Sequence, residues 1–131
     1  LGLYVIVTGN VDSVILNSVD GMTWTNPGAT NLLNPGRSVT WSPQVGRFLY
    51  VGVNNFTATS DNGTTWQNQQ VVGSQSINDV IWYNRQSRYY AVGADTWVYY
   101  TPSGLGDMRS KRLNLFGVPN ILSIAAGAFI P

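Results

Sequence analysis

Short runs of alternating apolar and polar residues recur along the whole chain, and Gly, Asn, Asp or Pro bound each run. The runs are rich in Val, Ile, Tyr, Trp and Thr, which are the residues that favour β-strands. No segment keeps an apolar period of 3.6 residues over three turns, so the sequence predicts almost no helix. We therefore expect an all-β protein.

The runs repeat at a spacing of about 42 residues. Gly21 and Gly63 lie 42 residues apart, and Trp41 and Trp82 lie 41 residues apart. Four-stranded units at a spacing of about 40–45 residues are typical of β-propeller blades. The sequence therefore predicts one propeller-type domain over 1–131, with repeats at about 1–37, 38–78 and 79–120 and a final strand within 121–131.

Each full repeat is expected to hold four strands, which we name A to D in chain order. The expected strands are 38–42 and 79–83 for A, then 3–8, 47–53 and 88–93 for B, then 13–17, 57–60 and 98–101 for C, then 23–26, 64–69 and 109–115 for D, with a last A strand at 121–125. The charged run at 109–112 fits a solvated edge strand, where charge prevents pairing between sheets.

These strands are out of phase with the repeats, because the first repeat lacks strand A and the last A strand lacks its repeat. Propellers close their ring with such an offset, but three blades are too few, since propellers have about four to eight. We expect a second chain to complete a six-bladed ring as a two-fold dimer, or the rest of a longer polypeptide to complete it. A non-propeller β-structure in a trimeric viral fibre is a third alternative.

Two segments carry Ser, Asp, Gly and Trp in the same order, namely 60–66 (SDNGTTW) and, as a near match, 18–24 (SVDGMTW). They resemble the Asp-box of sialidases and bacterial neuraminidase repeat proteins, and 101–107 looks like a decayed copy. The resemblance implies a turn between strands C and D, on the propeller face opposite the active site. In such a turn Asp accepts backbone N–H bonds, Gly adopts a positive φ and Trp fills the space between blades. We assign these structural roles to Ser18, Asp20, Gly21, Trp24, Ser60, Asp61, Gly63 and Trp66.

The residue types restrict the chemistry, because the chain has no Cys, no His and no Glu. Ser-His-Asp triads, Cys nucleophiles and structural zinc are excluded. Sialidases are known to pair a Tyr nucleophile with Glu, and that Glu is absent here. We therefore expect no catalytic residue, no metal and no cofactor. A glycosidase with Asp12 and Asp95 as its carboxylate pair is the remaining enzyme hypothesis.

Seven Lys and Arg oppose six Asp, and this near-neutral balance argues against nucleic acid and against an anionic membrane surface. No run of 18 apolar residues exists, so we expect no membrane insertion. The polar positions are mostly Asn, Ser, Thr and Gln, beside five Trp and seven Tyr. This texture suits an extracellular protein or a virion component.

The B–C and D–A loops lie on the propeller face opposite the one that carries the Asp-box turns. These loops carry amides, carboxylates and two aromatic residues at matching places, which suits sugar recognition. We predict a non-catalytic module that binds a glycan or a cell-surface receptor, through Asp12, Arg37, Asn55, Phe56, Asp95 and Trp97. Packing of the aromatic residues within the fold is the alternative role for them. A structural or assembly propeller that binds proteins is the alternative function, and a glycosidase is the third.

Overall fold

The computed structural model describes residues 2–9, 14–28, 32–69 and 75–127. The regular elements of these residues are ten strands and one short 3-10 turn. The strands are β1 (Tyr4–Val7), β2 (Ile15–Ser18), β3 (Gly36–Ser42), β4 (Arg47–Gly52), β5 (Thr57–Ser60), β6 (Gln67–Gln69), β7 (Ile77–Tyr83), β8 (Arg88–Gly93), β9 (Trp97–Thr101) and β10 (Arg109–Arg112), and the 3-10 turn η1 is Val53–Asn55. The all-β expectation is confirmed for this part of the chain.

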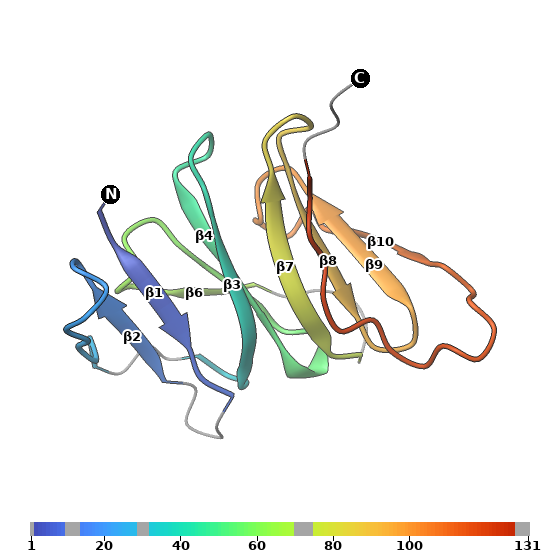
Figure 1. Cartoon of the computed structure of the whole chain (residues 1–131), viewed down its shortest axis with the longest axis horizontal. Coiled ribbons are helices and arrows are strands. Elements are labelled where there is room, and N and C mark those ends of the chain that lie inside the picture. Colours follow the sequence, from blue (N-terminus) through green and yellow to red (C-terminus); the bar gives the residue numbers. More distant parts are fainter. Residues whose placement is uncertain (1, 10–13, 29–31, 70–74, 128–131) are drawn as a thin grey trace.

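The strands form three antiparallel sheets that follow one another in chain order (Figure 1). Sheet 1 is β1–β2, sheet 2 is β3–β4–β5–β6, and sheet 3 is β7–β8–β9–β10. Every strand pairs with its neighbour in the sequence, so sheets 2 and 3 are simple meanders. Figure 1 shows the three sheets side by side in a row, with β1, β3 and β7 next to one another. This arrangement is that of consecutive propeller blades.

The alternation within β4 explains why both faces of sheet 2 are covered. Phe48 and Tyr50 point toward sheet 1, and Leu49 and Val51 point toward sheet 3. All four side chains are buried. A strand that is apolar on both faces belongs to a sheet with a neighbour on each side.

Two hydrophobic cores therefore lie between the sheets. The core between sheets 1 and 2 consists of Ile15, Phe48, Tyr50, Phe56, Ala58 and Trp66, with Val5 and Val7 packed against it. The core between sheets 2 and 3 consists of Leu49, Val51, Ile77, Val80, Tyr89, Ala91 and Tyr99. Aromatic rings form much of both cores, because a small number of large side chains can fill the wedge-shaped space between two sheets.

The strand registers fix which residues are equivalent in the three sheets. Tyr4 pairs with Ser18 in sheet 1, Phe48 pairs with Ser60 in sheet 2, and Tyr89 pairs with Thr101 in sheet 3. The three pairs hold the same place in their sheets, at the open end of the hairpin, where its second strand leads into the turn that follows it. All comparisons of positions below use this alignment.

Two expected strands are not strands in the structure, and a third is shorter than expected. The segment expected at 23–26 forms a single bridge, between Thr25 and Asn17, because the chain leaves the sheet at Asn26 and Pro27. The final strand expected at 121–125 is not a strand either. It is preceded by one bridge between Asn120 and Ala94. The expected strand at 64–69 is shorter, because residues 61–65 belong to the turn.

Candidate functional site: three grooves between neighbouring sheets

The turn between β2 and Thr25 is held by side-chain oxygens. The Ser18 hydroxyl accepts the N–H of Gly21 at 2.8 Å, and the Asp20 carboxylate accepts those of Met22 and Thr23 at 2.8 and 2.7 Å. Hydrogen bonds from Thr23, Met22 and Ser18 hold the pKa of Asp20 well below its ordinary value of 3.8. Gly21 has φ +75°, as a turn of this kind requires.

The turn between β5 and β6 repeats this arrangement with an amide in place of the carboxylate. Ser60 accepts the N–H of Gly63 at 2.8 Å, and the side-chain oxygen of Asn62 accepts those of Thr64 and Thr65 at 2.9 and 2.8 Å. The expectation that Asp61 holds this turn is therefore wrong. Counting from the serine, Asn62 takes the place of Asp20 and Asp61 takes that of Val19.

The tryptophans of the two turns differ in burial. Trp66 is buried, donates its ring N–H to the carbonyl of Gly63 at 3.3 Å, and packs on Phe48 and Tyr50. Its position between sheets 1 and 2 is the one expected from the sequence. Trp24 is only half-buried, because no sheet formed by the described residues covers the outer side of sheet 1.

The third turn, after β9, keeps the geometry with other residues. Thr101 takes the place of the serine and its hydroxyl accepts the N–H of Gly104 at 3.0 Å. The Asp107 carboxylate, several residues further on, accepts the hydroxyl groups of Thr101 and Ser103. The segment that looks decayed in sequence is therefore still a built turn.

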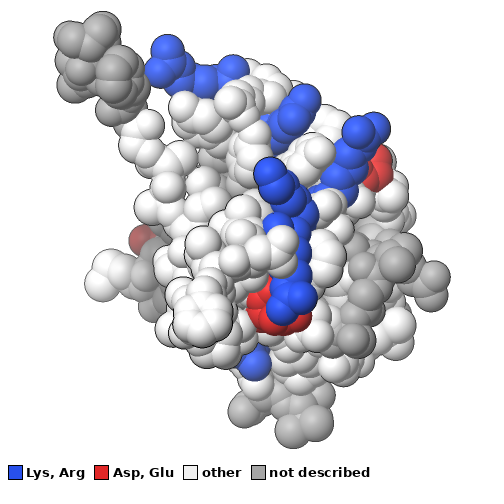
Figure 2. Space-filling view, turned by 90° about the vertical axis from the view of Figure 1, so that its right-hand side faces the viewer, with Lys and Arg blue, Asp and Glu red and all other residues white. Residues whose placement is uncertain are grey.

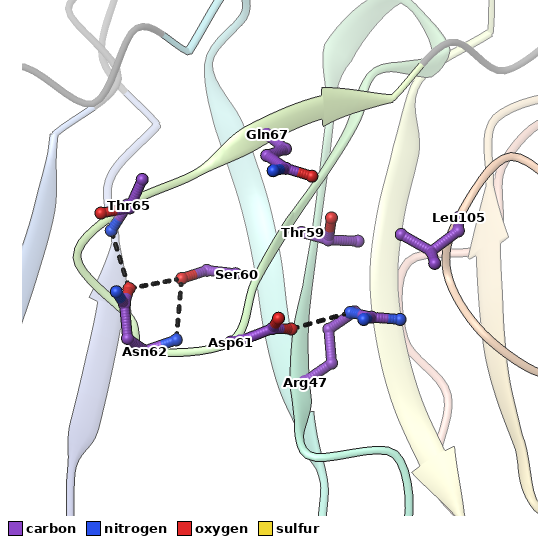
Figure 3. Close-up of a pocket in the computed structure, with 8 residues that line it drawn as sticks. All are labelled: Arg47, Thr59, Ser60, Asp61, Asn62, Thr65, Gln67 and Leu105. Atoms are coloured by element: carbon purple, nitrogen blue, oxygen red, sulfur yellow. Dashed lines mark hydrogen bonds and ion pairs between the residues drawn. The ribbon is translucent and has the colours of Figure 1, made fainter.

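A groove of about 200 Å³ opens between sheets 2 and 3 beside the second turn. We call it the middle groove (Figure 3). Arg47 and Asp61 point toward each other in this groove, and Leu105 reaches in from sheet 3. Its lining is Arg47, Thr59, Ser60, Asp61, Asn62, Thr65, Gln67 and Leu105.

The arginine of the middle groove joins the two sheets. Its Nε lies 2.9 Å from the Asp61 carboxylate, and its Nη1 donates to the carbonyl of Ser103 in sheet 3 at 3.2 Å. The backbone carbonyl of Arg47 accepts the Tyr89 hydroxyl at 2.6 Å. Burial raises the pKa of Tyr89 to about 12, so this phenol remains a donor at physiological pH.

Equivalent grooves lie at the other two turns. The first groove, of about 430 Å³ between sheets 1 and 2, is lined by Leu3, Asn17, Ser18, Val19, Thr23, Thr25, Pro27 and Thr64. The third groove, of about 260 Å³ on sheet 3, is lined by Arg88, Tyr100, Pro102, Asp107 and Arg109. In the alignment of the sheets, Leu3, Arg47 and Arg88 share one position, and Thr25, Gln67 and Arg109 share another.

The grooves differ in chemistry although they share a place in the fold. The first groove is mostly apolar, and the middle groove is polar around one ion pair. The third groove is cationic and aromatic, with the Arg88 guanidinium 5.6 Å from the centre of the Tyr100 ring. Figure 2 shows Lys and Arg gathered on the side of the molecule that carries sheet 3. The exposed members there are Arg85, Arg88, Arg109, Lys111 and Arg112.

The residues predicted for the loop face do not form one site. Phe56 is buried and packs edge-on against Tyr50, and Trp97 packs against Tyr99 in the other core. Asn55 is buried in the positive-φ turn of η1. Arg37 is exposed, Asp95 forms an ion pair with Arg112, and Asp12 lies outside the described residues.

Sequence reasoning missed the grooves, although one signal pointed to them. Arg47 and Arg88 recur at one position of the repeat, just before an apolar strand, where a charged residue has no role in the core. That recurrence marks an accessible position at the end of the strand. The contribution of Leu105 could not be read from the repeat, because it depends on which sheet lies alongside.

Among the described residues, no group of three His, Cys, Asp or Glu side chains is placed to hold a metal ion. Within the same ranges, no helix is long and apolar enough to cross a membrane. The six Asp residues of the chain are distributed over all three repeats.

Comparison with known proteins adds a likeness in fold. No family model matches the sequence, and no curated protein matches it. A solved nidogen/laminin complex contains a similar chain, with a TM-score of 0.58 and 15% identity, over 76% of this chain and 38% of that chain. This chain thus spans well under half of its neighbour. The likeness supports a β-propeller-type fold of antiparallel sheets.

Proposed function

We propose that this protein is a non-catalytic recognition module and that it binds a partner protein across the three grooves. The observation that carries this proposal is the contrast between turn and groove positions. The residues that hold each turn are conserved in kind between the sheets, with Ser or Thr first and Gly three residues later. The residues that line the grooves vary more, with Leu3, Arg47 and Arg88 at one equivalent position and Thr25, Gln67 and Arg109 at another, as in a scaffold that displays a varied surface.

The chemistry of the grooves favours a protein as partner. The first groove offers an apolar surface beside Leu3 and Val19, which suits an apolar side chain. The third groove offers Arg88 and Arg109, which suit a carboxylate, because guanidinium groups bind carboxylates with paired hydrogen bonds. A protein surface supplies both apolar side chains and carboxylates. The fold neighbour is itself part of a protein–protein complex, of nidogen with laminin.

A glycan is the second candidate, and the middle groove is the reason for it. Its lining of Thr59, Thr65 and Gln67 presents hydroxyl and amide groups, which suit sugar hydroxyls. The loop-face aromatic residues Phe56 and Trp97 pack within the cores, so they support this candidate less than the sequence suggested. We place the protein outside the cell or on a virion, as a partner on a cell surface requires.

The test is a parallel selection with a random-peptide display library and a panel of neutral and acidic glycans. We expect enrichment of peptides with an acidic residue near an apolar one, and loss of their binding in the R88A/R109A double variant. The R85A variant is the matched control, because Arg85 is exposed on sheet 3 and lines none of the three grooves. Binding of glycans alone would favour the second candidate. Binding of neither would contradict the recognition role.

A further inference from the structure

The outer face of sheet 1 is apolar and uncovered. Tyr4 is 57% exposed and Ile6 is 41% exposed. The equivalent residues of sheet 2, Phe48 and Tyr50, are 6% and 0% exposed. The same positions are therefore core in one sheet and surface in the other.

The outer face of sheet 3 has aromatic rings at its centre, and Arg88, Arg109 and Lys111 lie on the same face. Tyr90 lies between Tyr83, which it meets edge-on, and Tyr100, whose ring is tilted to it, and both pairs of ring centroids lie 6.4 Å apart. Val92, which is buried, and Val98, which is half-buried, lie beside this row of tyrosines. Three aromatic side chains in a row on the outer face of a sheet form a surface against which another sheet can pack.

These two faces are the two halves of an interface that the chain already forms twice. Between sheets 1 and 2, Val5 and Val7 meet Phe48 and Tyr50. Between sheets 2 and 3, the equivalent contact is made by Leu49 and Val51 with Tyr89 and Ala91.

A third contact of this kind has both of its halves available. Tyr90 and Val92 hold the places of Leu49 and Val51, and Tyr4 and Ile6 hold those of Phe48 and Tyr50. The outer face of sheet 3 therefore has side chains at the positions that would cover the outer face of sheet 1.

The segment at 119–124 marks where the next sheet lies. One carboxylate oxygen of Asp79 accepts the hydroxyl of Ser38 in β3 at 2.7 Å. The other accepts the Ser123 hydroxyl and the Ile124 N–H, both at 3.0 Å. The segment therefore lies against β7 on the side opposite β3. That place is the one an innermost strand of a following sheet would take.

In the described part of the chain, sheet 1 lacks the innermost strand that the segment at 119–124 resembles in position. Among the residues that the structure describes, β1 pairs with β2 only, whereas the equivalent strands β4 and β8 each pair on both edges. The free edge of β1 lacks the innermost strand that β3 and β7 supply in the other sheets. An open edge and a strand-like segment beside an open face are complementary.

We propose that two copies of this chain close one ring, in which sheet 3 of each copy packs on sheet 1 of the other. The residues 121–125 of one copy then lie along the free edge of β1 in its partner. The aligned regions cover 76% of this chain and 38% of the fold neighbour, so the neighbour is twice as long, because 76/38 is 2. Two copies thus supply the length of that chain. A head-to-tail contact closes when its rotations sum to a full turn.

Ring closure also completes the third groove. Thr64 and Leu105 are the residues by which the following sheet lines the first and middle grooves. Met22 holds the equivalent position in sheet 1 and is 87% exposed. In the closed ring Met22 of the second copy reaches the third groove, which then has a wall on each side. This inference stands whether or not the grooves bind a partner.

The first experiment is the solution mass of the full chain by light scattering after size exclusion. We expect 28.6 kDa, which is twice the chain mass of 14.3 kDa. A mass of one chain would overturn the proposal. A trimer or an open series of larger species would overturn it as well.

The second experiment identifies the faces with I6D on sheet 1 and V98D on sheet 3. Each variant alone should raise the dimer dissociation constant on the order of 100-fold, because it places an unpaired charge in the contact. The matched control is L33D, at a residue 74% exposed in the segment between sheets 1 and 2, which should leave the dimer intact.

Mixing I6D with V98D distinguishes the proposed contact from any symmetric one. A mixed dimer keeps one unaltered contact, between sheet 3 of the I6D copy and sheet 1 of the V98D copy. We therefore expect dimers to return on mixing, which also shows that both variants fold. A dimer that V98D leaves intact, or a mixture that stays monomeric, would overturn the proposal.

Discussion

Sheets 1 and 2 are built on one pattern, yet they differ in what covers them. Their hairpins share a register, with Tyr4 opposite Ser18 and Phe48 opposite Ser60. Their turns use the same hydrogen bonds from serine and from an Asp or Asn oxygen. Sheet 2 has a neighbour on both faces, and sheet 1 has a neighbour on one.

The difference shows that burial in this protein belongs to the contact between sheets and not to the strand. Phe48 is core because sheet 1 lies against it, and Tyr4 is surface because no sheet of the described residues covers it. Repeat proteins owe much of their stability to such contacts between neighbours. Four comparisons between equivalent residues test this account, from the largest expected effect to the smallest.

The largest effect is expected for F48A compared with Y4A. F48A should lower the free energy of unfolding by about 3–5 kcal/mol at any protein concentration, because it leaves a cavity in the core between sheets. Y4A should act through association, so its melting temperature should depend more strongly on concentration than that of F48A. Thermal melts over a range of protein concentrations measure both. Equal and concentration-independent losses would contradict the comparison.

The glycines of the two turns provide the second comparison. Gly21 and Gly63 have φ values of +75° and +76°, so alanine is strained at either position by about 1 kcal/mol. A Cβ at position 63 would also lie 2.6 Å from Leu3 and 3.2 Å from Val5, whereas at position 21 the nearest atom is 3.6 Å away. G63A should therefore cost about 1–3 kcal/mol more than G21A in denaturant unfolding. Equal costs would show that sheet 1 can move away from the turn.

The third comparison is between the turn held by the Asp20 carboxylate and the turn held by the Asn62 amide. Asp20 has a pKa below its ordinary value in the folded protein, so it favours folding above pH 3.8. That contribution is lost as the pH falls toward the folded-state pKa. The D20N variant copies the turn of Asn62 and does not titrate there. The difference in melting temperature between wild type and D20N should shrink as the pH falls below about 4. A constant difference would contradict this role of Asp20.

The smallest effect is expected for the ion pair of the middle groove. The Arg47 and Asp61 side chains are 20% and 71% exposed, so their coupling in a double-mutant cycle should be about 0.2–1 kcal/mol. R47A should cost more than D61A, because Arg47 also holds the carbonyl of Ser103. The first groove has Leu3 and Val19 in these places, so L3A and V19A should show no salt dependence. A salt dependence as strong as that of R47A and D61A would contradict this assignment.

The sequence predicted the strands of sheets 2 and 3 well, because alternating apolar residues and recurring glycines mark both their course and their ends. It failed at 23–26 and at 121–125, where a strand depends on a partner strand alongside. It also gave the wrong residue for the second turn. Asp61 fits the expected type, but the spacing from Ser60 gives the role to Asn62, whose amide oxygen accepts the same hydrogen bonds.

The candidate site was less predictable than the fold. The loop-face prediction combined polar loop residues with Phe56 and Trp97 as exposed rings. The structure agrees with the alternative for the two rings, because both pack within the fold. The grooves are formed by residues from neighbouring sheets, such as Arg47 and Leu105, which lie 58 positions apart in the chain. No pattern within one repeat reveals such a pair.

By itself, the sequence determined the repeat, the strand alternation and the turns, because these depend on residues close together in the chain. Only the tertiary structure decided which apolar faces are buried, which turns form grooves and which charges those grooves hold. The physical reason is that each sheet has two similar apolar faces. Whether such a face becomes core or surface depends on the sheet that packs against it, and local sequence carries no information on that neighbour.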